Sequence, residues 1–192
     1  MEAPRDLELE AAIDIAHQAH AGQVDKSGEP YIDHPRRVAQ NVESYFMTLD
    51  NCSREAVIAA WLHDVIEDSG YFGPQITEGD LRAKGISNKV VEIVKLLTFT
   101  KSAENSDDSE TRKATVKFSD KLAYYNTIKT HPLARVVKIC DLADNCNLQR
   151  VEAMKKSSGM SVNPDKYPLA LAALELTDEE WHWFNFRIGG KP

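Results

Sequence analysis

The sequence lacks both a long apolar run and a block of basic residues. No stretch approaches the roughly 18 apolar residues that a membrane-spanning helix needs, and no apolar segment typical of a secretion signal follows the first residues. The chain has 23 Lys and Arg against 30 Asp and Glu, a formal net charge of −7. Since nucleic-acid surfaces normally carry a basic patch, we expect no nucleic-acid partner. The missing apolar segments lead us to expect a cytoplasmic protein with no membrane partner.

Cysteine is also scarce. Cys52, Cys140 and Cys146 are odd in number and show no CxxC spacing, which fits reduced thiols better than a disulfide framework or a zinc knuckle. The chain of 192 residues is 42% hydrophobic, which is enough to form one compact domain over residues 1–192.

Helical periodicity dominates the chain, so we expect an all-α helical bundle. The expected helices run from Leu7 to Ala21, from His34-Pro35 onward, from Ser53 to Ser69, from Thr77 and from Ser87, over 110–129 and 133–149, and from Thr177 onward. Polar segments without periodicity at 23–31 and 101–109 are expected to be loops. Val162 to Pro164 should open a further helical stretch, and the aromatic face of the last helix should be core or a subunit contact.

The stretch Ala59–Asp68 places four polar groups in an apolar helical run. At about 100° per residue, His63, Asp64, Glu67 and Asp68 share one face of a helix. Three carboxylates this close would repel one another, and a divalent cation bound by His63 and Asp64 would offset their charge. The alternative is a solvated acidic helix end, which requires neither a histidine nor a strongly apolar opposite face.

Further ligands could come from two other helices. His34 stands at a helix start fixed by Pro35; alone it would be a capping or structural histidine, but it is a credible ligand if its helix packs beside His63. Asp141 and Asn145 are one four-residue step apart on a helix, so both can reach the same cavity.

The order His34, His63-Asp64, Asp141 resembles the H…HD…D metal-ligand series of the HD phosphohydrolase superfamily. Four stretches also resemble the hydrolase domain of RelA/SpoT proteins and its small stand-alone versions, which remove the 3′-pyrophosphate of guanosine tetra- and pentaphosphate. These stretches are 19–23, 26–35, 63–68 and 137–145. The resemblance covers about residues 7–150 and leaves a C-terminal helical extension over 151–192. No segment resembles the synthetase or regulatory domains of the long enzymes.

The resemblance implies a role for each matching residue. The metal, manganese in this family, would be held by His34, His63, Asp64 and Asp141. Glu67 and Asp68 correspond to carboxylates that help activate water. Contacts to nucleotide or phosphate are implied for Lys26, Ser27 and Asn145. Asp144 has no ligand role in the family and is expected to support the ligands.

One departure concerns the base contact. The family loop usually reads Gln-x-Arg-Lys-Ser-Gly, with the arginine near the guanine, whereas this chain has Asp25 at that position. We therefore expect hydrolysis of the 3′-pyrophosphate that is weaker and less guanine-selective than in arginine-bearing relatives. The alternative is that Asp25 faces solvent and another residue contacts the base.

Three classes of function follow. The first is a metal-dependent guanosine-3′,5′-bis(diphosphate) 3′-pyrophosphohydrolase, with a small nucleotide as substrate. The second is an HD-type phosphatase or pyrophosphohydrolase for another nucleotide, which Asp25 keeps open. The third is a metal- or nucleotide-binding module without turnover, which the intact Glu67-Asp68 pair disfavours. Homo-oligomerisation is open from the sequence.

Overall fold

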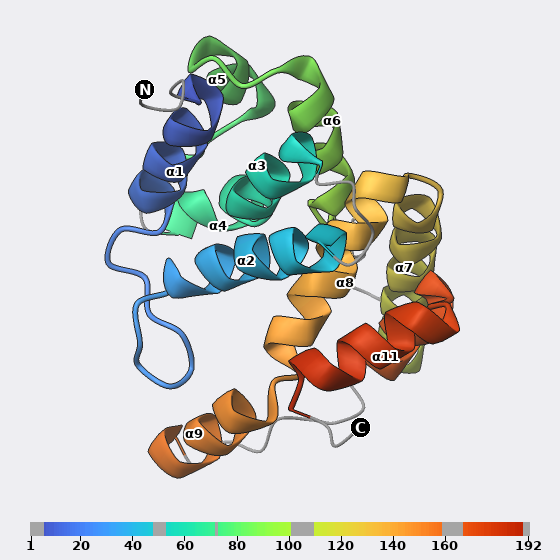
Figure 1. The fold of residues 1–192 in the computed structure, drawn as a ribbon. Helices are drawn as coiled ribbons and strands as arrows, with labels where there is room; N and C mark the ends of the chain where they lie inside the picture. Colours follow the sequence, from blue (N-terminus) through green and yellow to red (C-terminus); the bar gives the residue numbers. More distant parts are fainter. Residues whose placement is uncertain (1–5, 48–52, 72, 101–109, 159–166, 190–192) are drawn as a thin grey trace.

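A computed structural model describes residues 6–47, 53–71, 73–100, 110–158 and 167–189 (Figure 1). The helices are α1 (Leu7–Ala19), α2 (Asp33–Met47), α3 (Arg54–Leu62), α4 (Val65–Asp68), the 3-10 turn η1 (Ser69–Tyr71), α5 (Glu78–Ala83), α6 (Asn88–Leu97), α7 (Glu110–Lys129), α8 (Pro132–Asn145), α9 (Leu148–Ser158), α10 (Pro168–Leu174) and α11 (Asp178–Arg187). Among these residues the one β-type pairing is an isolated bridge between Val24 and Pro30, and the predicted all-α class is confirmed.

Helix α3 lies at the centre of the bundle and contacts α1, α2, α6 and α8. Residues 56–60 and Leu62 are all buried, because neighbouring helices surround α3, and a helix covered on all sides needs apolar side chains all round. This differs from the expected helix with one packing face and one chemical face. The polar groups instead follow the end of α3.

The predicted helix over 53–69 is interrupted at His63 and Asp64. The ring Nδ1 of His63 lies 2.7 Å from the carbonyl oxygen of Ala60, so the side chain uses a backbone acceptor of the last helical turn. Asp64 has φ −102° and ψ −5°, outside regular helix, and precedes α4. The two residues therefore occupy a turn between two helices.

Several helix boundaries follow the predicted signals. Thr77 and Thr177 each form a capping box, with Asp80 and Glu180 respectively, and α7 has the predicted bounds. The predicted helix over 133–149 is wrong at its end, because α8 stops at Asn145 and α9 begins at Leu148. The predictions for Cys52, 101–109 and 162–164 lie outside the described residues.

The last helix, α11, supplies core contacts from part of its aromatic set. Trp183 and Phe184 are buried, whereas Phe186 is 71% exposed, so the predicted core role is confirmed for two of the aromatic residues.

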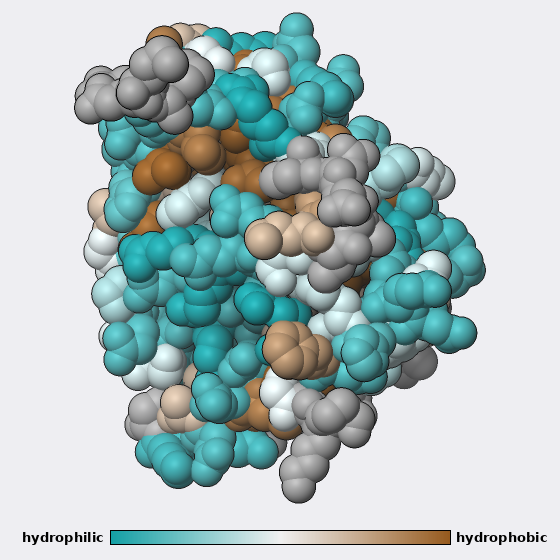
Figure 2. All heavy atoms as spheres, viewed as in Figure 1, coloured by the Kyte–Doolittle hydropathy of each residue, from teal (hydrophilic) through white to brown (hydrophobic). Residues whose placement is uncertain are grey.

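In Figure 2, hydrophilic side chains cover the outer face of α2, and apolar side chains gather over α1 and α3. Within the described residues, no helix combines the length and apolarity needed to cross a bilayer.

Candidate metal centre and active site

His34 enters the site from the first turn of α2. It is buried, and its Nδ1 lies 2.7 Å from Asp144 Oδ2. Because a carboxylate accepts, Nδ1 carries the proton and donates it to Asp144. The other ring nitrogen, Nε2, faces Asp141 Oδ1 at 3.3 Å and Asp64 Oδ2 at 3.6 Å.

His63 enters from the turn between α3 and α4. Its Nδ1 must donate to Ala60, since a carbonyl oxygen only accepts. Its Nε2 is buried and makes no hydrogen bond among the described residues, although Asp64 Oδ2 lies 3.1 Å away. An orphaned buried nitrogen next to a carboxylate is the arrangement expected of a ligand that awaits a cation.

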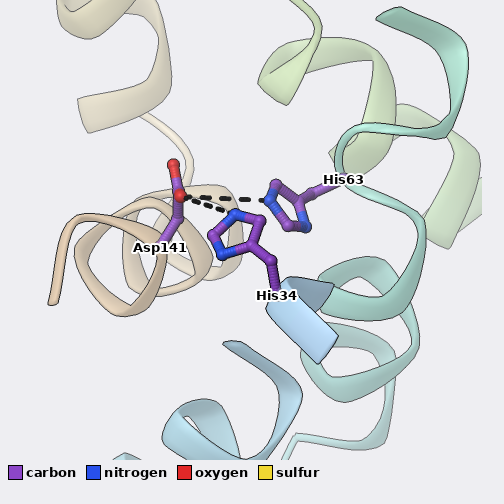
Figure 3. Close-up of side chains that lie close together, drawn as sticks. All are labelled: His34, His63 and Asp141. Atoms are coloured by element: carbon purple, nitrogen blue, oxygen red, sulfur yellow. Dashed lines mark ion pairs between the residues drawn. The ribbon is translucent and has the colours of Figure 1, made fainter. Parts of the chain in front are cut away.

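Two carboxylates lie next to these histidines: Asp141 on α8, and Asp64 in the turn between α3 and α4. Figure 3 shows His34, His63 and Asp141 pointing toward one another from separate parts of the chain. Each of the three offers a ligand atom, and these atoms lie within 4.8 Å of one another. Asp64 accepts a hydrogen bond of 2.7 Å from the Tyr31 hydroxyl, which orients its carboxylate toward the histidines. Asp64 lies outside this group of three, although its Oδ2 is 3.1 Å from His63 Nε2. Imidazole nitrogens and carboxylate oxygens together fit a divalent cation.

The pKa values of His34, His63 and Asp141 are shifted because these buried groups and their charged neighbours lie close together. Burial opposes a charge on His34, yet its contacts with Asp141 and Asp144 raise its pKa to about 9. The pKa of His63 is also raised, against burial, by Asp64 and Asp141. For Asp141, burial is outweighed by Lys138 and the histidines, which hold the pKa well below its usual range. Without a metal, a proton held by His34 at neutral pH offsets part of the carboxylate charge.

Glu67 and Asp68 follow on α4 and differ in their surroundings. Glu67 lines the cavity at the site and accepts a hydrogen bond of 3.2 Å from the Phe99 amide. Asp68 accepts one of 3.0 Å from Gln23 Nε2. Desolvation and the neighbouring carboxylates raise the pKa of both groups, which favours proton acceptance near neutral pH.

A cavity of about 400 Å³ is lined by three of the candidate metal ligands, His34, Asp64 and Asp141. Sequence reasoning missed most of its walls, which include Tyr31, Phe99, Lys121, Tyr124, Tyr125, Lys138 and Tyr167. Lys138 could have been found, because it stands one helical turn before Asp141 and pairs with Asp141 Oδ2 at 2.8 Å. The aromatic residues carry no local signal, since the loop before α2, the end of α6, α7 and the start of α10 meet at the cavity only in the folded bundle.

The expected nucleotide contacts are placed differently from one another. Asn145 lines the cavity and donates to Asp141 Oδ1 at 2.5 Å. Lys26 is exposed and Ser27 donates to Asp25 Oδ1 at 2.5 Å; neither is among the residues that line the cavity. The substrate contacts of Lys26 and Ser27 stay predictions.

Asp25 does not face solvent, so that part of the alternative is wrong; that another residue contacts the base stays a prediction. Its side chain is only 12% exposed. Oδ1 accepts hydrogen bonds from the amides of Ser27 and Glu29, at 2.8 and 3.1 Å, and Oδ2 pairs with Arg150 Nη2 at 3.3 Å. Asp25 therefore organises its own loop and reaches α9.

Comparison with known proteins shows which families and proteins this chain is similar to. A family model described as HD domain matches residues 12–157. A guanosine-3′,5′-bis(diphosphate) 3′-pyrophosphohydrolase of Haemophilus influenzae is 52% identical over 64 residues, 33% of this chain and 9% of that protein. The protein of the same name from Borreliella burgdorferi is 32% identical over 138 residues, 67% of this chain and 20% of that protein. The chain thus spans a fifth or less of the length of these two curated relatives.

A solved structure shares the fold over nearly the whole chain. It is reported as a metazoan ortholog of SpoT that hydrolyses ppGpp, and it matches with a TM-score of 0.63, 18% sequence identity, and coverage of 98% of this chain and 95% of that chain. At that identity the likeness establishes a common architecture.

Proposed function

The chain belongs to the HD domain family, and on that premise we propose that it is a metal-dependent phosphohydrolase that removes the 3′-pyrophosphate of guanosine 3′,5′-bis(diphosphate). One observation carries the proposal: His34, His63 and Asp141 come from three parts of the chain and offer ligand atoms within 4.8 Å of one another, with Asp64 Oδ2 beside them at 3.1 Å from His63 Nε2. The names of the relatives support the substrate. We propose His34, His63, Asp64 and Asp141 as the ligands and manganese as the metal.

When bound, the divalent cation would supply Lewis-acid chemistry, polarising a phosphate oxygen and water. The protein contributes the proton acceptors: Glu67, which lines the cavity, and Asp68 would orient water and take its proton. Hydrolysis forms a bond from the water oxygen to the proximal phosphorus of the 3′-pyrophosphate and breaks the bond from that phosphorus to O3′. The released pyrophosphate takes the former water oxygen, and O3′ takes a proton.

The cavity walls suit a nucleotide. Lys121 and Lys138 bring positive charge to the phosphate end, and the Asp141 contact helps to keep the pKa of Lys138 well above its usual range. Tyr124, Tyr125 and Tyr167 offer aromatic faces on which a base can stack. Asn145 adds a side-chain amide to the cavity wall beside Asp141.

A second candidate is hydrolysis of a different phosphorylated nucleotide by the same centre. The observation that favours it is at position 25, where the family has an arginine near the base. This chain has Asp25 there, and its carboxylate contacts the Ser27 amide and Arg150. A module that binds without turnover is disfavoured, because Glu67 and Asp68 retain raised pKa values beside the ligand cluster.

A product screen tests the proposal. Purified protein with Mn²⁺ is offered guanine and adenine nucleotides with and without a 3′-pyrophosphate, and pyrophosphate and nucleotide products are separated by chromatography. We expect pyrophosphate and guanosine 5′-diphosphate from the leading substrate, and no product with Asp64→Asn. Faster turnover of another nucleotide would favour the second candidate. A metal-bound structure in which His34 or Asp141 points away from the ion would overturn the ligand assignment.

A further inference from the structure

A buried polar network lies on the Nδ1 side of the His34 imidazole, opposite the Nε2 atom that faces Asp141 and Asp64. Its centre is Asp144, whose side chain is only 4% exposed. Asp144 accepts from His34 Nδ1 at 2.7 Å and from Arg37 Nε at 2.7 Å, and it also pairs with Arg150 Nη1. A buried carboxylate with three cationic or donating partners is held in one orientation.

Arg150 connects this centre to the loop before α2. Its Nη1 contacts Asp144 and its Nη2 contacts Asp25 Oδ2 at 3.3 Å. Asp25 in turn binds the loop backbone at Ser27 and Glu29. The contacts therefore run without a gap from the loop at 25–29, through Arg150 and Asp144, to His34.

We propose that Asp25 and Arg150 are positioning residues for the metal ligand His34, acting through Asp144, so that this loop sets the affinity for the divalent cation. The proposal rests on the proposed function only in taking His34 as a ligand. It assigns to Asp25 a role in the metal centre in place of one in base selection.

The physical reason lies in the tautomer and tilt of the imidazole. A carboxylate at Nδ1 fixes the proton there, leaves Nε2 free for the cation and holds the ring plane, and loss of such a partner typically lowers metal affinity by about 10- to 100-fold. Asp144 can do this only while its own carboxylate is held. Arg37 provides one support, and the Arg150–Asp25 pair provides the other.

Charge and position predict opposite results for Arg150→Gln, which makes the test decisive. Removing a positive charge near a cation site should strengthen metal binding by simple electrostatics. Removing the support of Asp144 should weaken it. We expect weaker Mn²⁺ binding, by about 3- to 10-fold, less than for direct loss of the carboxylate partner. Arg36→Gln is the matched control: Arg36 stands two residues after His34 on α2, but its side chain is 46% exposed and pairs with Asp33 and not with Asp144.

Asp25→Asn provides a milder second variant. The amide oxygen can still accept from the Ser27 and Glu29 amides, so the loop is retained, but the amide nitrogen cannot accept from Arg150. We expect a smaller loss of Mn²⁺ affinity, because Arg150 keeps its contact with Asp144. Since Arg150→Gln already removes the contact with Asp25, the double variant should bind Mn²⁺ no more weakly than Arg150→Gln alone. Guanine over adenine preference should stay that of the wild type.

Isothermal titration of metal-free protein with Mn²⁺ measures the affinities, with circular dichroism to confirm folding. Affinities of Arg150→Gln and Asp25→Asn equal to that of Arg36→Gln would overturn the inference, as would a changed base preference with unchanged metal binding. Because the readout is binding, a wild type that binds Mn²⁺ yet hydrolyses no nucleotide would refute the proposed function alone. A wild type that binds no metal would refute both.

Discussion

Of the three carboxylates next to His34 and His63, Asp64 is the one without a Lys or Arg partner among the described side chains. Lys138 pairs with Asp141, and Arg37 and Arg150 pair with Asp144. Among the described side chains, Asp64 forms ion pairs only with His34 and His63. Since these imidazoles must be unprotonated at Nε2 to bind a metal, the metal itself has to replace their protons as the counter-charge of Asp64.

Glu67→Gln should separate metal binding from turnover. Glu67 lines the cavity but is not in the ligand cluster, so Mn²⁺ affinity should stay within about twofold of wild type while kcat falls by about 10²- to 10⁴-fold, the usual contribution of a placed proton acceptor. Asp68→Asn should act in the same direction. Steady-state kinetics and metal titration measure the two effects, with the exposed Glu92→Gln as the control. Near wild-type rates in both variants would remove the two carboxylates from the mechanism.

Gln23→Met tests how Asp68 is tuned. His20 Nδ1 and Asp68 Oδ2 both contact the Gln23 amide, at 2.7 and 3.0 Å. The amide donates to Asp68 and lowers its pKa against the effect of burial. Without that donor the pKa of Asp68 rises, so the acid limb of the kcat profile should move to higher pH. The control is Gln18→Met, because Gln18 pairs with Lys84 in an exposed contact. An unmoved acid limb would contradict a role for Asp68 as base.

At the scale of the helices, local signals were sufficient where a cap or proline decides the boundary. Thr77, Ser87 and Thr177 begin helices as predicted, because each side chain accepts from an amide of the first turn. The ends were less predictable. Nothing in the periodicity marks the turn at His63-Asp64 or the end of α8 at Asn145.

Glu180 should matter more to stability than the cap it forms. It closes the capping box with Thr177, and it is also buried against Arg135 and the Tyr45 hydroxyl, the latter at 2.6 Å. Thr177→Ala should cost about 0.5–2 kcal/mol in the free energy of unfolding. Glu180→Ala should cost about 3–5 kcal/mol, because it leaves Arg135 without its ion-pair partner.

Urea denaturation measures both changes. Thr77→Ala is the matched variant, since Thr77 forms a capping box on the exposed start of α5 without a buried ion pair. Equal losses for Glu180→Ala and Thr177→Ala would show that the contacts to α2 and α8 do not stabilise the C-terminal helix.

For the whole molecule, the complete set of candidate ligands followed from the resemblance, whereas local spacing pointed only to parts of it. Spacing links His63 to Asp64 and Asp141 to Asn145, but His34 and Asp141 stand 107 positions apart and meet because α2 and α8 pack together. The same long-range packing brings Tyr124 and Tyr167 to the cavity and Arg150 to Asp25. Such contacts depend on which helices become neighbours, which local periodicity does not specify.

The stability of the metal-free protein should fall as pH rises above neutrality. The pKa of His34 is about 9 in the folded chain against an ordinary 6.5, so its stabilising contribution is complete below pH 6.5 and is lost between pH 6.5 and about 9. At about 1.36 kcal/mol per pKa unit, this amounts to at most roughly 3 kcal/mol. His63 has the same sign. Asp64, Asp141 and Asp144 have lowered pKa values, so their contributions are lost only in acid.

Urea unfolding of chelator-treated protein at pH 6.5, 7.5 and 8.5 measures this slope, and His182→Asn on the exposed face of α11 is the control that should keep it. Saturating Mn²⁺ should oppose the trend, because the cation competes with protons for the two imidazoles and binds better as pH rises. The stabilisation by metal, taken as the difference between the two titrations, should therefore grow from pH 6.5 to 8.5. A metal-free stability that is flat or rises over this range would mean that His34 does not hold its proton against Asp141 and Asp144.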